Sequence, residues 1–397
     1  MKAVMYGAGN IGRGFIAQKF SLAGYDVVFV DVNSEIVDNI NEQKRYPLTI
    51  VCNEPYDIYV ENVSAVNGIN KDLVIEQIVT ADIMATSIGA NILPLIAPIV
   101  AQALEKRWAQ NPDSKLDILL CENLNHADKI FRELLEKNIS ANYLDKLAAN
   151  LGLIETSIGR MVPIMTEEMQ KGNPLRVCVE EYDFLPIDKD AFVNEVLTGP
   201  NIVPYSPFSF FIQRKLFLHN MGHAMTAYMG DLMGYEYIAD AIGDPFIKYF
   251  VKSAMQQSAT ALHIKYNVKI TELFDHVDDL LYRFSNKALK DSIGRVGRDP
   301  IRKVAANDRF SGAIDFCCEE GIYPIHIALG LAYALNNLKQ SSADFALDQL
   351  LSEHVKLNPA LTNQVKEFIS LIEAKADFKA VNAYIELCQR KVRGSIV

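Results

Sequence analysis

The sequence lacks several features that mark whole classes of protein. Its six cysteines form no Cys-x-x-Cys pair and no metal-ligand spacing, and no apolar run reaches the length of a membrane-spanning helix. Among 397 residues, 39 Lys and Arg face 49 Asp and Glu, and this net charge of −10 argues against nucleic acid or an anionic membrane as the main partner. The glycine-rich start leaves no room for a signal peptide. We therefore expect reduced thiols, a cytoplasmic location and a small-molecule partner.

Short apolar runs alternate with amphipathic stretches through the first half of the chain. Four runs are typical of buried parallel strands, and a fifth alternates like a further strand: AVMYG (3–7), DVVFVD (26–31), DIMATS (82–87), DILLCEN (117–123) and PLRVCVEEYDF (174–184). Residues 10–24 and 93–107 have helical periodicity. This alternation predicts an α/β fold with a Rossmann-type doubly wound sheet.

The pattern changes near LTGPNIVPYSPF (197–208), where three prolines and one glycine indicate a turn or linker. Beyond it, helical periodicity dominates, with candidate helices at 209–229, 245–264, 271–285, 309–319, 324–338, 342–353 and 360–373. We therefore expect a dinucleotide-binding domain over residues 1–200 and an all-helical substrate domain over residues 201–397.

The chain begins with a glycine motif, Gly7-Ala8-Gly9-Asn10-Ile11-Gly12, between the first predicted strand and the first predicted helix. In such a GxGxxG turn, the first glycine permits the tight bend and the second lets the backbone approach a pyrophosphate. The third allows the helix to pack closely on the strand. The free N–H groups at the helix start would hold the anion. Asn10 and Ile11 belong to this predicted cofactor-binding turn.

The second predicted strand ends in Asp31, nineteen residues after Gly12. A carboxylate at this place accepts hydrogen bonds from the adenosine ribose hydroxyls and repels a 2′-phosphate. No arginine follows in VNSE, so the pattern favours NAD over NADP. Two alternatives stay open: a glycine turn without a ligand, and a methyltransferase that holds S-adenosylmethionine in the same layout.

The stretch KLFLHNMGHA (215–224) places four polar side chains in an apolar helical segment. A lysine shielded from water has a lowered pKa, so Lys215 would act as general base in alcohol oxidation and general acid in ketone reduction. Asn220 would donate to the reacting oxygen, and His223 would orient the substrate or the lysine. At about 100° per residue of an α-helix, Lys215 would lie about 80° from His223. The alternatives are a solvated lysine and a structural histidine.

A metal site is the rival interpretation of the same stretch. His219 and His223 are spaced i, i+4 and could share one ion. No third ligand is evident, and Asn220 stands where a metalloprotease would need glutamate. We therefore predict metal-independent chemistry.

Three motifs in order, GAGNIGRGF, KLFLHNMGHAMTAYMG and RVGRDPIRK, resemble those of the mannitol dehydrogenase family, the polyol-specific long-chain dehydrogenases. The resemblance extends from the first strand to about residue 330, and it implies that Lys215 is catalytic with Asn220 and His223 as partners. It also implies a second oxyanion donor at Asn123, after Cys121-Glu122. The alternative role of Asn123 is the N-cap of the helix that follows it.

Four cations lie within nine residues in RVGRDPIRK (295–303). Arginine matches phosphate oxygens in two-point contacts, so Arg298 and Arg302 are candidates for holding a sugar phosphate. The alternative is ordinary ion pairing with Asp291, Asp299 and Asp308. The resemblance favours phosphate without selecting an arginine.

Taken with these features, the resemblance implies an NAD-dependent enzyme that interconverts D-mannitol 1-phosphate and D-fructose 6-phosphate, with the helical domain bringing its lysine to the nicotinamide. The family also contains enzymes for free mannitol, fructuronate and tagaturonate, so a related polyol or hexuronate remains an alternative. A regulator that senses NAD(H) without turnover is a rival from another class, although no basic recognition helix supports it.

Overall fold

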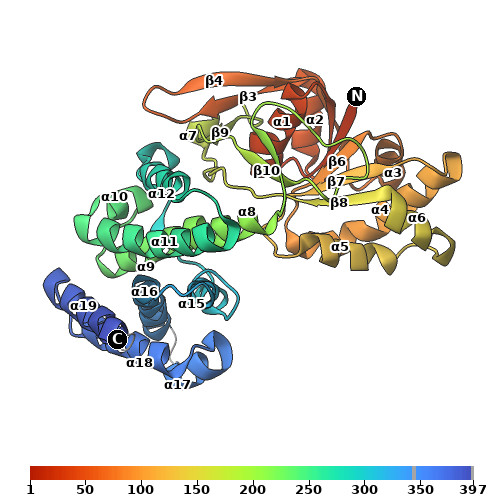
Figure 1. The fold of residues 1–397 in the computed structure, drawn as a ribbon. Coiled ribbons are helices and arrows are strands. Elements are labelled where there is room, and N and C mark those ends of the chain that lie inside the picture. Colours follow the sequence, from red (N-terminus) through yellow and green to blue (C-terminus); the bar gives the residue numbers. More distant parts are fainter. Residues whose placement is uncertain (342–345, 395–397) are drawn as a thin grey trace. The chain divides into compact units, whose positions relative to one another are not determined.

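The computed structural model describes residues 1–341 and 346–394 and divides the chain into two compact units, Met1–Phe211 and Ile212–Val397. The first unit combines sheets with helices, and the second is helical wherever it has regular structure (Figure 1). The α/β fold class expected from the sequence is confirmed. No helix in the described part of the chain combines the length and apolar character that crossing a membrane requires.

A six-stranded parallel sheet with the order β5-β2-β1-β6-β7-β8 forms the centre of the first unit. Its strands are β1 (Lys2–Tyr6), β2 (Asp26–Asp31), β5 (Val63–Asn67), β6 (Ile83–Thr86), β7 (Leu116–Leu120) and β8 (Leu151–Glu155). The chain builds outward from β1 to β5 and then returns to β6 on the other side of β1. The sheet therefore has a switch point between β1 and β6, where ligands of open α/β sheets bind at the carboxyl ends of the strands.

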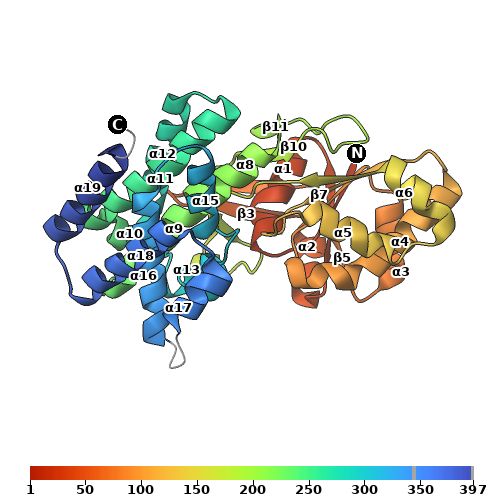
Figure 2. The ribbon, with the colours of Figure 1, turned by 60° about the horizontal axis from the view of Figure 1, so that its bottom comes forward.

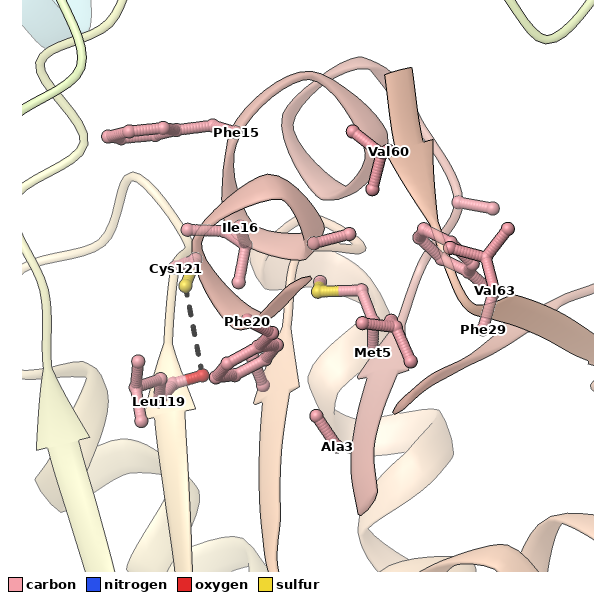
Figure 3. Close-up of a cluster of buried hydrophobic side chains, with 14 of the residues drawn as sticks. Ala3, Met5, Phe15, Ile16, Phe20, Phe29, Val60, Val63, Leu119 and Cys121 are labelled. Atoms are coloured by element: carbon pink, nitrogen blue, oxygen red, sulfur yellow. Dashed lines mark hydrogen bonds between the residues drawn. The ribbon is translucent and has the colours of Figure 1, made fainter. Parts of the chain in front are cut away.

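Helices cover both faces of this sheet, so its strands are apolar on both sides. Ala3 and Met5 of β1 pack into one core, which Figure 3 shows with Phe15, Ile16 and Phe20. The alternate residues Val4 and Tyr6 pack into the other core. The covering helices are α1 (Ala17–Leu22) and α2 (Ser34–Gln43) on the first side and α3 (Lys71–Val79), α4 (Leu93–Gln110), α5 (Ala127–Glu136) and α6 (Leu144–Asn150) on the second.

Several strands of the first unit were not predicted. A hairpin of β3 (Arg45–Ile50) and β4 (Tyr56–Glu61) joins β9 (Val177–Val179) in a three-stranded sheet, and β10 (Leu185–Asp188) pairs with β11 (Ile202–Tyr205). β5 and β8 were also missed. The strand predicted over 174–184 is shorter than expected, because only Val177–Val179 form β9. Pro47 lies inside β3, and β5, β8, β9, β10 and β11 have only three to five residues each, so little of a period-2 pattern was visible in them.

The second unit is a group of helices built around α9 (Met221–Leu232). Helices α11 (Pro245–Tyr266) and α16 (Ile325–Ser341) both pack on α9 and on each other (Figure 2). Its other helices include α10 (Ile238–Gly243), α12 (Ile270–Phe284), α13 (Ile293–Val296), α14 (Pro300–Val304), α15 (Ser311–Glu319), α18 (Pro359–Glu373) and α19 (Phe378–Gly394). The helix predicted over 342–353 falls partly outside the described residues. Its remainder forms α17 (Leu347–Gln349) and a π-helical turn, η6 (Leu350–Val355). The sequence did not predict α19.

Candidate functional site

The glycine turn follows β1 at the switch point of the sheet. Gly7 has a φ of 106°, and a Cβ atom there would lie 2.6 Å from the carbonyl oxygen of Ser87, which follows β6. A Cβ atom on Gly12 would lie 2.0 Å from the carbonyl oxygen of Gly7. At Gly9, by contrast, nothing described lies within 4 Å of the position of a Cβ atom. Gly7 and Gly12 thus hold the turn together, whereas Gly9 borders open space that a ligand can enter.

A pocket of about 410 Å³ opens beside this turn, lined by Ala8, Gly9, Asp31 and Glu35 among others. Asp31 accepts hydrogen bonds from the backbone N–H groups of Ala8 at 2.7 Å and Asn33 at 3.0 Å. These two bonds fix the carboxylate at the pocket wall. Glu35 adds a second acidic group, which disfavours a phosphate on the ribose. The two carboxylates and the open space at Gly9 therefore fit an adenine dinucleotide without a 2′-phosphate.

Arg13 is a pocket residue that the sequence analysis missed. Its guanidinium is buried and donates to the carbonyl oxygens of Ala8 at 2.6 Å and Leu175 at 2.5 Å, while Tyr46 donates to the Arg13 carbonyl at 2.7 Å. These bonds tie the glycine turn to the residues before β9. Only its position inside GNIGRG could have drawn attention to it, because its partners are distant in sequence.

Asn10 and Ile11 lie in the turn with structural contacts of their own. The Asn10 amide donates to the carbonyl oxygen of Pro163 at 3.3 Å, and Ile11 packs against the apolar core. Their contact with a cofactor stays a prediction. The helix expected over 10–24 begins instead as a π-helical turn, η1 (Gly12–Ile16), which continues into α1.

Asn123 is exposed just after β7. It is not the N-cap of α5, because His126 occupies that position and makes no side-chain capping bond. Its neighbour Glu122 is buried and accepts hydrogen bonds from the Thr86 hydroxyl at 2.8 Å and the Ile88 N–H at 3.2 Å. Burial raises the pKa of Glu122. The structural alternative for Asn123 is therefore wrong, and its role as an oxyanion donor stays a prediction.

In the second unit, the stretch Lys215–Asn220 forms a π-helical turn, η4, between α8 (Ser209–Arg214) and α9. The sequence analysis had assumed α-helical geometry, in which five residues turn through about 500° and leave Lys215 and Asn220 about 140° apart. A π-helix closes on i→i+5 bonds instead, so Asn220 comes back over Lys215. The assumed angle between Lys215 and His223 is therefore wrong, and the π turn places Lys215 and Asn220 on one side of the helix.

His223 is held on α9 by two contacts. Its Nε2 atom lies 2.9 Å from the Oδ2 atom of Asp291, and its ring stacks on Phe284 with centroids 4.9 Å apart and planes at 15°. The Nε2 atom of His223 makes no well-aligned hydrogen bond within the described chain, so this contact is a close approach of the ring to the carboxylate. Arg295 donates from Nε and Nη2 to the other carboxylate oxygen at 2.9 and 2.6 Å. Although burial acts to raise the pKa of Asp291, His223 and Arg295 outweigh it and lower that pKa.

His219 occupies a different position from His223. It is buried, its ring centroid is 6.0 Å from that of His223, and its pKa is lowered well below the ordinary value by burial and then by Arg283, His223 and Lys215. The ring is therefore neutral at physiological pH. Within residues 1–341 and 346–394, no three His, Cys, Asp or Glu side chains gather closely enough to hold a metal ion. The rival site of His219 and His223 thus has no third protein ligand in the described chain.

The basic cluster lies beside α9, because α13 packs on that helix and the Tyr228 hydroxyl donates to the Gly297 carbonyl oxygen at 3.1 Å. Within the cluster, the ion-pairing alternative holds for Arg295 with Asp291, and six residues beyond the cluster Arg309 lies 2.8 Å from Asp308. Arg302 is 3.5 Å from Asp308 and half exposed.

Arg298 is exposed, and the only hydrogen bond that its side chain makes within the described chain is a 3.4 Å contact with the Arg295 carbonyl oxygen. Among the described residues it has no carboxylate partner. Arg298 is therefore the cation of this cluster best placed to meet an anion from solution.

Two protein-family models match this chain, one in its N-terminal half and one in its C-terminal half. The model of the mannitol dehydrogenase Rossmann domain matches residues 1–198, and that of the mannitol dehydrogenase C-terminal domain matches residues 208–394. The chain is 37% identical over 333 residues to a mannitol-1-phosphate 5-dehydrogenase of Thermoanaerobacter pseudethanolicus, covering 84% of each sequence. It is also 37% identical over 337 residues to one of Caldanaerobacter subterraneus subsp. tengcongensis, covering 84% of this chain and 86% of that one.

Solved structures show the same fold at lower identity. A substrate-free D-sorbitol dehydrogenase aligns with a TM-score of 0.80 at 18% identity, covering 96% of this chain and 94% of that one. A Pseudomonas fluorescens mannitol 2-dehydrogenase, solved as a ternary complex with NAD and D-mannitol, aligns with a TM-score of 0.74 at 16% identity, covering 98% and 94%. The two domain models and the 37% identical relatives show that this chain belongs to the mannitol dehydrogenase family.

Proposed function

We propose that this chain is an NAD-dependent, metal-independent dehydrogenase that interconverts D-mannitol 1-phosphate and D-fructose 6-phosphate. The observation that carries the substrate class is the 37% identity to two mannitol-1-phosphate 5-dehydrogenases over 84% of the chain. The open space at Gly9 and the fixed Asp31 carboxylate support NAD as the cofactor. The exposed Arg298 beside α9 supports a phosphorylated substrate.

The N-terminal unit would hold the cofactor, with the Gly7–Gly12 turn at the pyrophosphate and Asp31 at the adenosine ribose. When bound, NAD accepts a hydride from the sugar carbon. The Asp31 carboxylate accepts from two backbone N–H groups and would lie at the adenosine ribose rather than at the reacting carbon. The proton of the substrate hydroxyl needs an acceptor at the nicotinamide end of the cofactor.

In this proposal Lys215 takes that proton. Its side chain is half-buried on η4, and Lys215 lies close enough to His219 to lower the pKa of that ring. Asn220 follows one π turn later and donates its amide N–H to the reacting oxygen, and Asn123 is the second proposed donor. His223 orients the substrate. In the reverse direction, Lys215 returns the proton to the oxygen of the ketone.

A substrate panel tests the proposed function directly. We expect NADH oxidation, followed by absorbance, to be fastest with fructose 6-phosphate, and its kcat/KM to exceed that for fructose, fructuronate and tagaturonate by at least about a hundredfold. A site that binds phosphate leaves its cations unpaired when the substrate lacks that group. A higher kcat/KM for fructuronate or tagaturonate would assign the chain to the hexuronate branch of the family instead.

Arg298 is the arginine we expect to hold the phosphate. Arg298→Ala should raise KM for fructose 6-phosphate about tenfold to a hundredfold, because a charge-assisted contact to the phosphate is lost, with little change in kcat. Arg302→Ala is the matched control and should have a smaller effect, since Arg302 already faces Asp308 at 3.5 Å. Unchanged KM values in both variants would remove the cluster from substrate binding.

Asp291 is a positioning residue for His223 that the sequence analysis named only as an ion-pair partner. Asp291→Asn should lower kcat about tenfold to a hundredfold through misplacement of the imidazole, with KM for NADH unchanged. Asp291→Glu should restore part of the rate. A loss of stability without any change in kcat would show that the carboxylate is purely structural.

The same variant has an expected pH signature. Because the folded pKa of Asp291 is lowered below the ordinary 3.8, its stabilising contribution is fully present above that pH and is lost as pH falls through the folded value. The difference in unfolding free energy between wild type and Asp291→Asn should therefore decrease as pH falls below the ordinary carboxyl pKa of 3.8. Denaturant unfolding at several pH values measures it.

A further inference from the structure

A second pocket, of about 820 Å³, lies in the C-terminal unit at the far end of α9 from the proposed active site. Leu232 and Met233 at the end of α9, Phe246 in α11 and Phe378 in α19 supply apolar walls. His223 and Leu232 are nine residues apart on α9, which corresponds to about 13 Å along the helix. The volume is in the range of pockets that bind small molecules. Nothing in the proposed reaction uses this pocket.

Two polar side chains of α16 line the pocket without partners. Tyr333 and Asn336 are spaced i, i+3 on one face of the helix and are only 6% and 5% exposed. Within residues 1–341 and 346–394, no hydrogen bond reaches the hydroxyl of Tyr333 or the amide of Asn336. Neither side chain has a polar atom that is both fully buried and unpaired, so these atoms border the open space of the pocket. Both side chains therefore offer hydrogen bonds to an occupant of the pocket.

The charged residues around the pocket are already satisfied or hydrated. Lys339 Nζ lies 2.5 Å from the Glu373 carboxylate, and Asp377 accepts from the backbone N–H of Ala380 at 2.9 Å, which caps α19. Lys375 is exposed to solvent. The pocket thus presents no charge that requires a counter-ion, and its occupant need not be charged.

Aromatic rings determine the shape of the ligand that fits. Phe246 and Phe378 stand edge to face, with centroids 5.8 Å apart and planes at 71°, and the ring of Tyr333 joins them in the lining. Flat rings pack favourably on such walls. The Asn336 amide presents a donor and an acceptor side by side, which match the adjacent N–H and C=O of a cyclic amide.

We propose that this pocket is a second small-molecule site, which binds an uncharged planar ring compound whose edge carries a hydrogen-bond donor next to an acceptor. The site is independent of the proposed turnover, and its test needs no substrate.

Two probes of the same ring size test the proposal on the full chain. Isothermal titration calorimetry should show 2-quinolinone binding with a Kd of about 1 mM or lower. Quinoline, which lacks the N–H and C=O pair, should bind about tenfold more weakly. Asn336→Leu should weaken 2-quinolinone about tenfold and leave quinoline within about twofold. Asn337→Leu is the matched control, because the Asn337 amide bonds the Asp231 carboxylate at 2.7 Å outside the pocket, and it should change neither affinity.

A second variant keeps the proposal testable if Asn336→Leu does not fold. Ala376→Trp places an indole in the pocket lining and should abolish binding of both probes. The proposal fails if 2-quinolinone gives no heat at about 5 mM, or if Ala376→Trp binds it as wild type does. It also fails if Asn336→Leu weakens both probes equally. Sedimentation that shows a dimer of wild type and a monomer of Ala376→Trp would assign the pocket to a second copy of the chain, which also overturns the proposal.

Discussion

Replacing Lys215 with alanine should lower kcat for fructose 6-phosphate reduction by about a hundredfold to ten-thousandfold, the usual range for loss of a general acid. The enzyme would lose its proposed proton carrier. The dinucleotide pocket lies in the other unit and is not lined by Lys215, so the substitution should not disturb it. Quenching of protein fluorescence by NADH should therefore give a Kd close to that of wild type. Stopped-flow absorbance at the NADH band measures the rate.

Two controls separate this role from a general effect of charge. Lys269→Ala removes an exposed lysine that faces Glu272 at 3.5 Å and should leave kcat unchanged. A small primary amine added to the Lys215→Ala enzyme should restore part of the rate, because it can occupy the vacated space and carry the proton. Wild-type activity should also survive EDTA and exhaustive dialysis. Near-normal turnover of Lys215→Ala would refute the lysine mechanism, and loss of activity in EDTA would favour a metal.

The second large effect is expected in the Gly7–Gly12 turn, where replacing Gly12 with alanine should lower both stability and NADH affinity. Gly12→Ala places a methyl carbon 2.0 Å from the Gly7 carbonyl oxygen, so the helix must move away from the strand. Overpacking of this kind costs about 1–3 kcal/mol. We expect a lower melting temperature together with NADH affinity reduced at least about tenfold, measured by differential scanning calorimetry and by titration of NADH.

Gly9→Ala is the matched variant, because its methyl group would meet nothing described within 4 Å. It should leave the melting temperature unchanged and still reduce NADH affinity, since the methyl group enters space that the pyrophosphate would fill. This split between stability and affinity is specific to a ligand-binding turn. If Gly9→Ala binds NADH as wild type does, the cofactor does not approach this turn.

Much of the N-terminal fold could be predicted because its signals are local. The strand at 26–31 matches β2, and the runs at 3–7, 82–87 and 117–123 match β1, β6 and β7 within a few residues. Parallel strands buried on both faces are continuous apolar runs, and this pattern is visible in sequence. The β3–β4 hairpin and β8 escaped prediction because their burial depends on neighbours that the chain supplies elsewhere.

The helical half shows the limit of periodicity more sharply. A helix over 209–229 was expected, and the segment is helical, but its middle is a π turn at Lys215–Asn220. A π turn has no composition of its own, because the extra residue is stabilised by packing around it. Angles computed for an ideal α-helix therefore misplaced Lys215 relative to His223.

The sequence by itself determined that this chain has a GxGxxG motif after its first strand, a carboxylate at the end of its second strand and a Lys-Asn-His stretch in an apolar helical segment. These are properties of residue type and spacing along a few neighbouring turns. Only the tertiary structure decided that Asp291 and Phe284 hold His223, that Arg298 lacks a carboxylate partner among the described residues, and that Asn336 lines a pocket in the second unit. Those facts depend on contacts between residues far apart in the chain, which packing alone brings together.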